Sequence, residues 1–435
     1  MSGILGINRN KWHSNFGLGQ ANYKGDYNYK YNGKTGKIIN NDFNQLFYTM
    51  DVKGRVLSNL FISMNFLFSE QERGVSGLVY SPSPNAKRKD QIQLFQLKIF
   101  WQMNKHLFSV STQTRNSKET YNDPQYVIDS KHDLFVNQLF MQWHFKPKSN
   151  INFEQGIQLK SQKIKSTDTN YHLHKFWAYS NTINWQSRSN LSFEAGFRYD
   201  LQREGLSAWT WQSGIEYKKN IYRLSIIAGN GFRFPTFNDM YWIPGGNSKL
   251  KPETSQWIKL ENKLNLNDHS LTFKTTLKLN TNLIQWKSNG SFWSPENISR
   301  YRKQVLTLAA SGPLIGSISY SGHFTLNDAK DTSLKKQLRY TPNTLGNLSF
   351  YFKNPSIDWW LSGHYMGERI SMYSWPTDVM LNPYFILSAG LNRPLSNQIS
   401  ISIICENLLD TPLMTINGYP ESERSFSIKI QFKPN

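Results

Sequence analysis

The stretch Ser425-Phe426-Ser427-Ile428-Lys429-Ile430-Gln431-Phe432 alternates polar and apolar side chains along its whole length. Neighbouring side chains on a β-strand point to opposite faces, so this pattern predicts a strand with one apolar and one polar face. The same alternation recurs from end to end of the chain, for example in Phe95 to Met103 and in Leu271 to Leu279. The sequence therefore predicts an all-β protein.

The composition indicates where such strands lie. Of the 435 residues, 38% are hydrophobic and 14% are aromatic, and the mean hydropathy is −0.56. No segment approaches the roughly 20 consecutive apolar residues of a transmembrane helix, whereas the alternating runs have about the ten residues with which a tilted strand crosses a bilayer. We therefore expect a large antiparallel transmembrane β-barrel.

The connections between the alternating runs differ regularly in length. Short turns such as Asn104 to His106 and Lys218 to Asn220 alternate with long polar loops, among them Gly74 to Lys89, Asn116 to Ser130 and Phe237 to Thr254. Outer-membrane barrels have short periplasmic turns and long external loops, and the hairpins predict about 20 strands. Tryptophans near the predicted strand ends fit an aromatic belt at the membrane interfaces: Trp101, Trp143, Trp177, Trp185 and Trp257.

The net charge of +20 raises an alternative, a soluble basic β-protein that binds nucleic acid or polysaccharide. The basic residues are scattered, however, and the densest run, Lys87-Arg88-Lys89, is short. We interpret this run as a solvated or lipopolysaccharide-facing surface and expect no nucleic-acid partner.

Catalytic and metal-binding patterns are weak. His172 and His174 would share one strand face, but no third ligand accompanies them, and no nucleophile elbow or zinc-protease helix occurs. The single cysteine, Cys405, falls in an apolar run and is interpreted as a packing residue. We therefore expect no enzyme, with no catalytic, cofactor-binding or metal-binding residue.

The most specific motif is Gly231-Phe232-Arg233-Phe234-Pro235-Thr236-Phe237-Asn238-Asp239-Met240-Tyr241-Trp242, followed by Gly246-Asn247-Ser248-Lys249-Leu250-Lys251-Pro252-Glu253-Thr254-Ser255. Pro235 has no N–H for a strand ladder and should end a strand, Gly246-Asn247 should form a turn, and Pro252 should form a rigid corner.

Three further motifs accompany it. They are Glu406-Asn407-Leu408-Leu409-Asp410 with Gly418-Tyr419-Pro420 and Arg424-Ser425-Phe426, then Ile284-Gln285-Trp286 with Trp293-Ser294-Pro295-Glu296-Asn297, and Glu72-Arg73-Gly74.

On these motifs the chain resembles the TonB-dependent outer-membrane receptors, and the Trp286 and Trp293 runs are similar to those of cobalamin-receptor-like members. The resemblance implies a multi-pass 22-stranded barrel in the bacterial outer membrane that encloses a plug. It also implies uptake of a large scarce nutrient, cobalamin or an iron chelate, driven by the TonB complex.

We expect residues 1–435 to form this barrel alone, truncated at the N-terminus and without signal peptide, TonB box or plug. The TonB complex would then act only if a plug is supplied separately. The expected partners are outer-membrane lipid and lipopolysaccharide, with a surface lipoprotein as a further candidate, and the barrel is expected to be a monomer.

Tyr241 and Trp242 are the candidate ligand contacts, because they lie in the external loop that follows Pro235. An ordinary interfacial role is the alternative for both. Polar residues of the opposite strand face should line a wet lumen: Lys259, Glu261, Lys263, Lys274 and Lys278.

Overall fold

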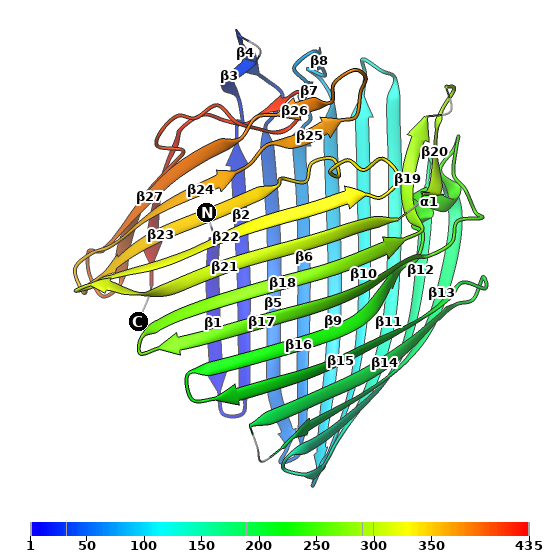
Figure 1. Ribbon diagram of the computed structural model, residues 1–435, viewed down its shortest axis with the longest axis vertical. Coiled ribbons are helices and arrows are strands. Elements are labelled where there is room, and N and C mark those ends of the chain that lie inside the picture. Colours follow the sequence, from blue (N-terminus) through cyan, green and yellow to red (C-terminus); the bar gives the residue numbers. More distant parts are fainter. Residues whose placement is uncertain (1, 32, 188–189, 289, 299, 434–435) are drawn as a thin grey trace.

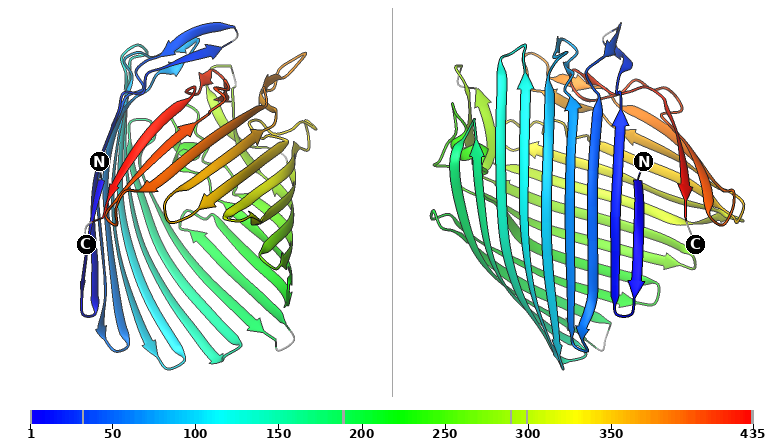
Figure 2. Two further views of the ribbon diagram at one scale, coloured as in Figure 1. Left: turned by 90° about the vertical axis from the view of Figure 1, so that its left-hand side faces the viewer. Right: turned by 180° about the vertical axis from the view of Figure 1, so that it is seen from behind.

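The computed structural model describes residues 2–31, 33–187, 190–288, 290–298 and 300–433. Its principal element is one antiparallel sheet of 21 strands, in which each strand pairs with the next one along the chain. The sheet curls round into a barrel wall (Figure 1, Figure 2). No helix within the described ranges is long and apolar enough to cross a membrane.

The strands of the wall are β1 (Ser2–Arg9), β2 (Trp12–Tyr23), β5 (Phe43–Leu57), β6 (Leu60–Gly74), β9 (Lys87–Met103), β10 (His106–Asp123), β11 (Ile128–Lys148), β12 (Ile151–Ser166), β13 (Asn170–Gln186), β14 (Leu191–Gln202), β15 (Ser207–Lys219), β16 (Tyr222–Arg233), β17 (Glu253–Leu266), β18 (His269–Thr281), β21 (Tyr301–Ile315), β22 (Ile318–Asp331), β23 (Thr344–Lys353), β24 (Asp358–Met366), β27 (Tyr384–Pro394), β28 (Ile399–Glu406) and β31 (Ser425–Phe432).

Small elements occupy the long connections at one end of the wall (Figure 1). They are the hairpins β3 (Tyr27–Tyr31) with β4 (Lys34–Ile38), β7 (Gly77–Leu78) with β8 (Ser81–Pro82), β19 (Leu283–Ser288) with β20 (Trp293–Ile298), β25 (Arg369–Met372) with β26 (Val379–Leu381) and β29 (Met414–Ile416) with β30 (Tyr419–Pro420), and the helix α1 (Phe237–Tyr241).

The predicted all-β barrel is confirmed, but several strands are longer than predicted. β11 has 21 residues, and the predicted loop from Asn116 to Ser130 belongs largely to β10 and β11, which leaves only residues 124–127 as their connection. The end of β10, from Arg115 to Asp123, is polar on both faces. A ladder of backbone hydrogen bonds continues there without any hydrophobic periodicity, so the alternation could not reveal it.

The alternating residues lie on the faces that the sequence predicts. Leu277 and Leu279 share one face of β18 and are 46% and 52% exposed, while Lys274 and Lys278 point to the other face. Only twelve hydrophobic residues of the described chain are buried, although 38% of the sequence is hydrophobic. The apolar side chains therefore form an exposed band on the wall rather than a core, as contact with hydrocarbon requires.

The tryptophan prediction holds for three positions and fails for two. The pairing register places Trp101, Trp143 and Trp185 on the apolar face near the turn ends of their strands. Trp177 is also on the apolar face, but it lies in the middle of β13 rather than near a strand end. Trp257 pairs with Lys278 on the opposite face, and the Lys259 ammonium lies 4.5 Å from its ring centroid. Trp257 is therefore not a belt residue, because the parity of its strand turns it inward.

The wall has a seam between its first and last strands. Among the described residues β1 pairs only with β2, and β31 pairs only with β28. Strict antiparallel alternation over 21 strands makes β1 and β31 run in the same direction (Figure 2, right). Ile428 and Ile430 of β31 are 69% and 70% exposed, whereas Ile403 on the neighbouring β28 is 46% exposed. One further strand of opposite direction would fit the pairing pattern of both edges.

Candidate functional site

The connection between β16 and β17 folds back as an ordered loop. β16 ends at Arg233, two residues before Pro235, as the missing proline N–H predicts. Thr236 then caps α1: its Oγ1 accepts a hydrogen bond from Asp239 N at 3.1 Å, and Asp239 Oδ2 accepts one from Thr236 N at 2.9 Å. This reciprocal capping box starts the short helix directly after the strand.

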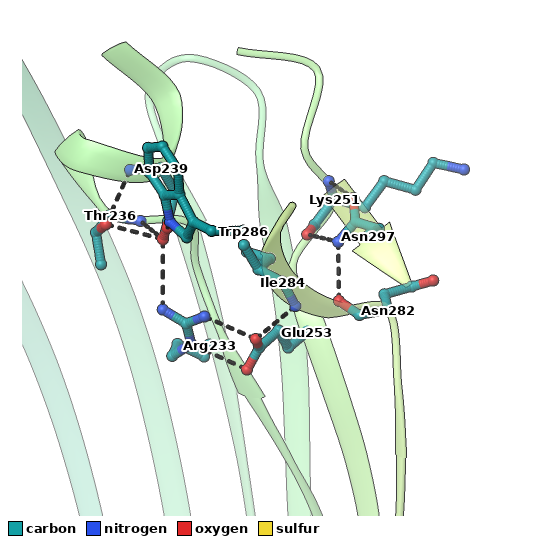
Figure 3. A network of polar contacts seen from close by, with 9 residues as sticks. All are labelled: Arg233, Thr236, Asp239, Lys251, Glu253, Asn282, Ile284, Trp286 and Asn297. Carbon is teal, nitrogen blue, oxygen red and sulfur yellow. Dashed lines mark hydrogen bonds and ion pairs between the residues drawn. The ribbon is translucent and has the colours of Figure 1, made fainter. Parts of the chain in front are cut away.

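Arg233 is the centre of the loop's polar contacts (Figure 3). Arg233 and Glu253 are directly opposite on β16 and β17, and Arg233 Nε and Nη2 donate to the two Glu253 carboxylate oxygens at 2.9 and 2.7 Å. Arg233 Nη1 lies 3.5 Å from Asp239 Oδ2. The Asp239 and Glu253 side chains are only 8% and 17% exposed, so one guanidinium neutralises two mostly buried carboxylates.

The β19–β20 hairpin is tied to the same two carboxylates. Trp286 Nε1 donates to Asp239 Oδ1 at 3.1 Å, and the backbone N–H of Ile284 donates to Glu253 Oε1 at 2.8 Å (Figure 3). Each carboxylate thus accepts from the hairpin on one side and from Arg233 on the other. These contacts connect four parts of the chain, namely the end of β16, the α1 loop, the start of β17 and the β19–β20 hairpin.

Two asparagines complete the network. Asn297 Nδ2 donates to the carbonyls of Lys251 and Asn282 at 2.9 and 2.8 Å, and its Oδ1 accepts from Lys251 N at 2.8 Å. Asn247 Nδ2 donates to Pro295 O at 3.1 Å. We call the set Arg233, Thr236, Asp239, Asn247, Glu253, Trp286 and Asn297 the signature cluster. All of its members come from the sequence motifs, and together they fix the loop against the wall.

The helix α1 packs on aromatic side chains of β13. His172 and His174 lie on the face opposite to the exposed Leu173. The Tyr241 ring stacks on His172 with centroids 3.6 Å apart and planes 4° apart, and His174 Nε2 and Tyr241 Oη form a 3.1 Å hydrogen bond. Phe237 stacks on His174 at 4.3 Å. The two imidazoles are therefore used in packing, and the described residues contain no group of three or more side chains suited to a metal ion.

The two predicted ligand contacts have different surroundings. Tyr241 is half-buried, and burial, reinforced by the Glu204 carboxylate, raises the pKa of its hydroxyl, which therefore stays protonated at neutral pH. Trp242 is half-buried at the end of α1, where its backbone N–H donates to Asn238 O at 3.2 Å. The structure brings both into the α1 loop beside the signature cluster, and their contact with a ligand stays a prediction.

Sequence reasoning did not identify three exposed aromatic residues at the loop end of the wall as candidate ligand contacts, although Trp293 belongs to one of the motifs. Trp375 between β25 and β26 is 92% exposed, Tyr80 between β7 and β8 is 62% exposed, and Trp293 at the start of β20 is 58% exposed. Aromatic residues that interrupt polar Ser-, Pro- and Asn-rich connections were the signal that could have identified them. Exposed rings of this kind offer stacking surfaces to a ligand that approaches from the loop side.

The densest basic run is neutralised within the structure. The Lys87 ammonium is 2.7 Å from Asp42, Arg88 is 3.0 Å from Asp90 and 2.9 Å from Glu119, and Lys89 is 2.9 Å from Glu70. Each of its three cations therefore has a carboxylate partner, while the Lys87, Arg88 and Lys89 side chains stay 44%, 33% and 47% exposed. The interpretation of this run as a solvated or lipopolysaccharide-facing surface stays a prediction. Asp90 is on the same strand as Arg88, whereas Asp42, Glu70 and Glu119 lie on neighbouring strands or loops, so the sequence did not show these three partners.

The predicted lumen residues share one face of β17 and β18. Glu261 is opposite Lys274, and their side chains form a 3.0 Å ion pair, while Lys259, Lys263 and Lys278 occupy neighbouring positions of that face. The opposite face carries the exposed Ile258. This part of the inner wall is hydrophilic and predominantly basic.

Sequence comparison identifies relatives. The family model described as "TonB dependent receptor-like, beta-barrel" matches residues 3–408. The vitamin B12 transporter BtuB of Photobacterium profundum is 26% identical over 338 residues, which are 74% of this chain and 53% of the relative. The BtuB of Vibrio vulnificus is 23% identical over 241 residues, 53% of this chain and 38% of the relative. The chain thus spans about half the length of these curated relatives, or less.

Solved structures with the same wall include the copper transporter OprC, with a TM-score of 0.83 at 11% identity over 99% of this chain and 78% of that one. The siderophore receptor PirA of Acinetobacter baumannii has a TM-score of 0.84 at 11% identity over 99% of this chain and 76% of that one. At such identities the likeness establishes the fold.

Proposed function

The chain belongs to the TonB-dependent receptor family, and from this membership we propose that it forms the outer-membrane barrel of a receptor that takes up a large, scarce nutrient. The family consists of receptors and transporters that cross the outer membrane with strands, and it is not a family of enzymes. Membership therefore rules out the alternative of a soluble basic β-protein that binds nucleic acid or polysaccharide.

The observation that carries the proposal is the size of the wall together with its polar inner face. Barrels of about 16 to 18 strands already leave an aqueous channel, and side chains alone do not fill a wider one. A wall of 21 strands lined by Lys259, Lys274 and Lys278 therefore encloses a wet passage large enough for a bulky solute. Such a passage supports transport rather than a closed structural role.

Control of that passage is proposed to come from a plug, supplied by the same receptor or by a separate polypeptide, on which the TonB complex acts. A further antiparallel strand is proposed to lie between β1 and β31, which would complete the ring of backbone hydrogen bonds that hydrocarbon demands. We also propose that the barrel works as a monomer surrounded by outer-membrane lipid and lipopolysaccharide, with a surface lipoprotein as a candidate partner.

Cobalamin is the first ligand to test, and an iron chelate is the second. The BtuB relatives are named as vitamin B12 transporters. The exposed rings of Trp375 and Trp293, with Tyr241 and Trp242 in the loop beside Trp293, are proposed to contact a large planar ligand by stacking.

Equilibrium binding of radiolabelled cyanocobalamin to outer membranes that contain the receptor tests this proposal. We expect saturable binding that weakens at least tenfold when Trp375→Ala and Trp293→Ala are combined. Trp209→Ala is the matched control, because Trp209 is 63% exposed but lies on the lipid-facing side of β15. Saturable binding of a ferric siderophore alone would transfer the assignment to iron, and binding of neither ligand would contradict the proposal.

A further inference from the structure

A cluster of basic side chains lies on the lipid-facing side of the wall, at the loop ends of three strands. It consists of Lys163 and Lys165 on β12, Lys175 on β13 and Arg203 directly after β14, and all four side chains are exposed. Alternation places Lys175 on the same face as the exposed Leu173 and Trp177. We call these four residues the outer basic cluster.

The strand register brings the four cations together. Lys163 pairs with Leu173 and Ser161 pairs with Lys175, so Lys163 and Lys175 are diagonal neighbours. The backbone N–H of Arg203 donates to Lys175 O at 2.9 Å. Sheet geometry then sets successive members roughly 5–8 Å apart. A single phosphorylated head group can reach several of them at once.

These cations have no carboxylate partner in the part of the chain that the structure describes. The Lys163 ammonium lies 5.5 Å from the Phe135 ring centroid, and no ion pair involves Lys165, Lys175 or Arg203. The carboxylates nearest in the sheet and in the chain are Asp133, which pairs with Lys165 across the ladder, and Glu204, which follows Arg203, and both are exposed.

Two other groups of lipid-facing cations at the loop end are neutralised. Lys89 is 2.9 Å from Glu70, and Asp328 is 3.6 Å from Arg302 and 2.9 Å from Lys330. The outer basic cluster therefore differs from these two groups, because its positive charge is available to an external anion.

An apolar hollow adjoins the cluster on its membrane side. The hollow has a volume of about 660 Å³. It is lined by Leu159, Trp177 and Leu201, with Lys175 and Arg203 beside them. An apolar hollow beside free cations on a lipid-facing surface is complementary to an amphiphile with an anionic head.

We propose that this surface binds a phosphorylated, acylated lipid of the outer leaflet. Its phosphate lies between Lys163, Lys175 and Arg203, where the guanidinium donates a forked pair of hydrogen bonds, and one acyl chain lies along the hollow. The inference rests on the proposed membrane setting and locates the lipid partner on particular residues.

The test is native mass spectrometry and equilibrium lipid binding with the receptor purified from outer membranes in detergent. The probes are diphosphoryl lipid A, its dephosphorylated form and inorganic phosphate. The combined variant Lys163→Gln, Lys175→Gln and Arg203→Gln is compared with Lys89→Gln, Arg302→Gln and Lys330→Gln, which removes the same charge from paired positions.

We expect diphosphoryl lipid A to bind at least tenfold more weakly to the cluster variant, and to stay within twofold of the wild type for the paired control. Removal of both phosphates from the lipid should cause a similar loss. Equal affinity of the cluster variant and the wild type would overturn the proposal. Inorganic phosphate that competes as well as the lipid would overturn the choice of a lipid.

Two measures keep the result interpretable. If the triple variant does not assemble, Lys175→Gln alone should weaken lipid binding. Arg203→Lys keeps the charge but not the paired N–H donors of the guanidinium, so it should weaken lipid binding less than Arg203→Gln. Equal loss in the two Arg203 variants and none in Lys175→Gln would contradict the proposed contacts. Cyanocobalamin binding is measured on the same samples, so loss of nutrient binding and loss of lipid binding are scored separately.

Discussion

The wall formed by β12 to β14 and the wall formed by β17, β18 and β21 have the same alternation but differ in what covers each face. On the first wall the α1 loop covers the inner face, where His174 is only 3% exposed, and the outer face carries unpaired cations. On the second wall the inner face is an open row of lysines, and Arg302 on the outer face is paired with Asp328. Strand parity decides which face a residue occupies, whereas loops and neighbouring strands decide its environment.

The largest effect should come from a charge placed on the lipid side of the second wall. Leu277→Arg puts a cation into hydrocarbon, and we expect a loss of about 2–4 kcal/mol in the free energy of unfolding. Lys278→Arg, one residue away on the inner face, should change it by less than about 0.5 kcal/mol. Urea unfolding in phospholipid vesicles, followed by tryptophan fluorescence, measures both. Equal changes in the free energy of unfolding at the two positions would show that one face of β18 is not in hydrocarbon and the other in water.

Removal of the Arg233 guanidinium should release the α1 loop from the inner face of the first wall. Arg233→Ala leaves the largely buried Asp239 and Glu253 without a counter-charge, and we expect the docked loop to lose about 2–3 kcal/mol, reduced for the partial exposure of Arg233. The amides of Ile243 and Asn247, which donate to Asp168 O and Asp239 O, should then exchange hydrogen roughly 30- to 150-fold faster. Unchanged protection at both amides would contradict the role of the signature cluster.

A smaller effect should follow from the loss of one hydrogen bond between the α1 loop and the first wall. Tyr241→Phe keeps the stack on His172 and removes the hydroxyl that contacts His174, which should cost about 1 kcal/mol of loop docking and speed exchange at Ile243 about fivefold. Tyr171→Phe is the control, since Tyr171 lies on β13 beside His172 but is 58% exposed on the lipid-facing side. A control variant that loosens the loop as much as Tyr241→Phe would mean that the hydroxyl contact contributes nothing.

The smallest effect should be seen on the open lysine row. Lys274 and Glu261 form a 3.0 Å pair, but their side chains are 53% and 32% exposed, so solvent screens the attraction. Lys274→Gln should therefore change the free energy of unfolding by about 0–1 kcal/mol. The same urea titration measures this change in the free energy of unfolding. A loss of about 2–3 kcal/mol would indicate that the inner face of the second wall is also shielded from solvent.

Most of the wall was predictable because alternation reports directly on strand faces. The runs at Phe95, Leu271 and Phe426 all form strands with the predicted faces, and the 21 strands observed are close to the 20 expected. The prediction failed where side chains carry no period of two, as in the polar end of β10, and where parity alone decided the face, as at Trp257.

The site was predictable as a set of residues but not as an arrangement. The motifs contain Arg233, Asp239 and Glu253, yet their convergence depends on the register that places Arg233 opposite Glu253 and on the capping box that turns Asp239 toward it. The outer basic cluster was invisible in the sequence for the same reason. Its four cations are up to 40 positions apart, between Lys163 and Arg203, and only the pairing of β12, β13 and β14 brings them together.

The most direct test of the two-faced wall is spin-label accessibility in lipid vesicles. In a Cys405→Ser background, which removes the single cysteine, labels are placed one at a time at Ile258, Lys259, Leu277 and Lys278. Labels at Ile258 and Leu277 should collide with dissolved oxygen and be shielded from a water-soluble nickel complex, and labels at Lys259 and Lys278 should show the reverse. Equal nickel accessibility at all four positions, or shielding of the two lysine positions alone, would contradict the account.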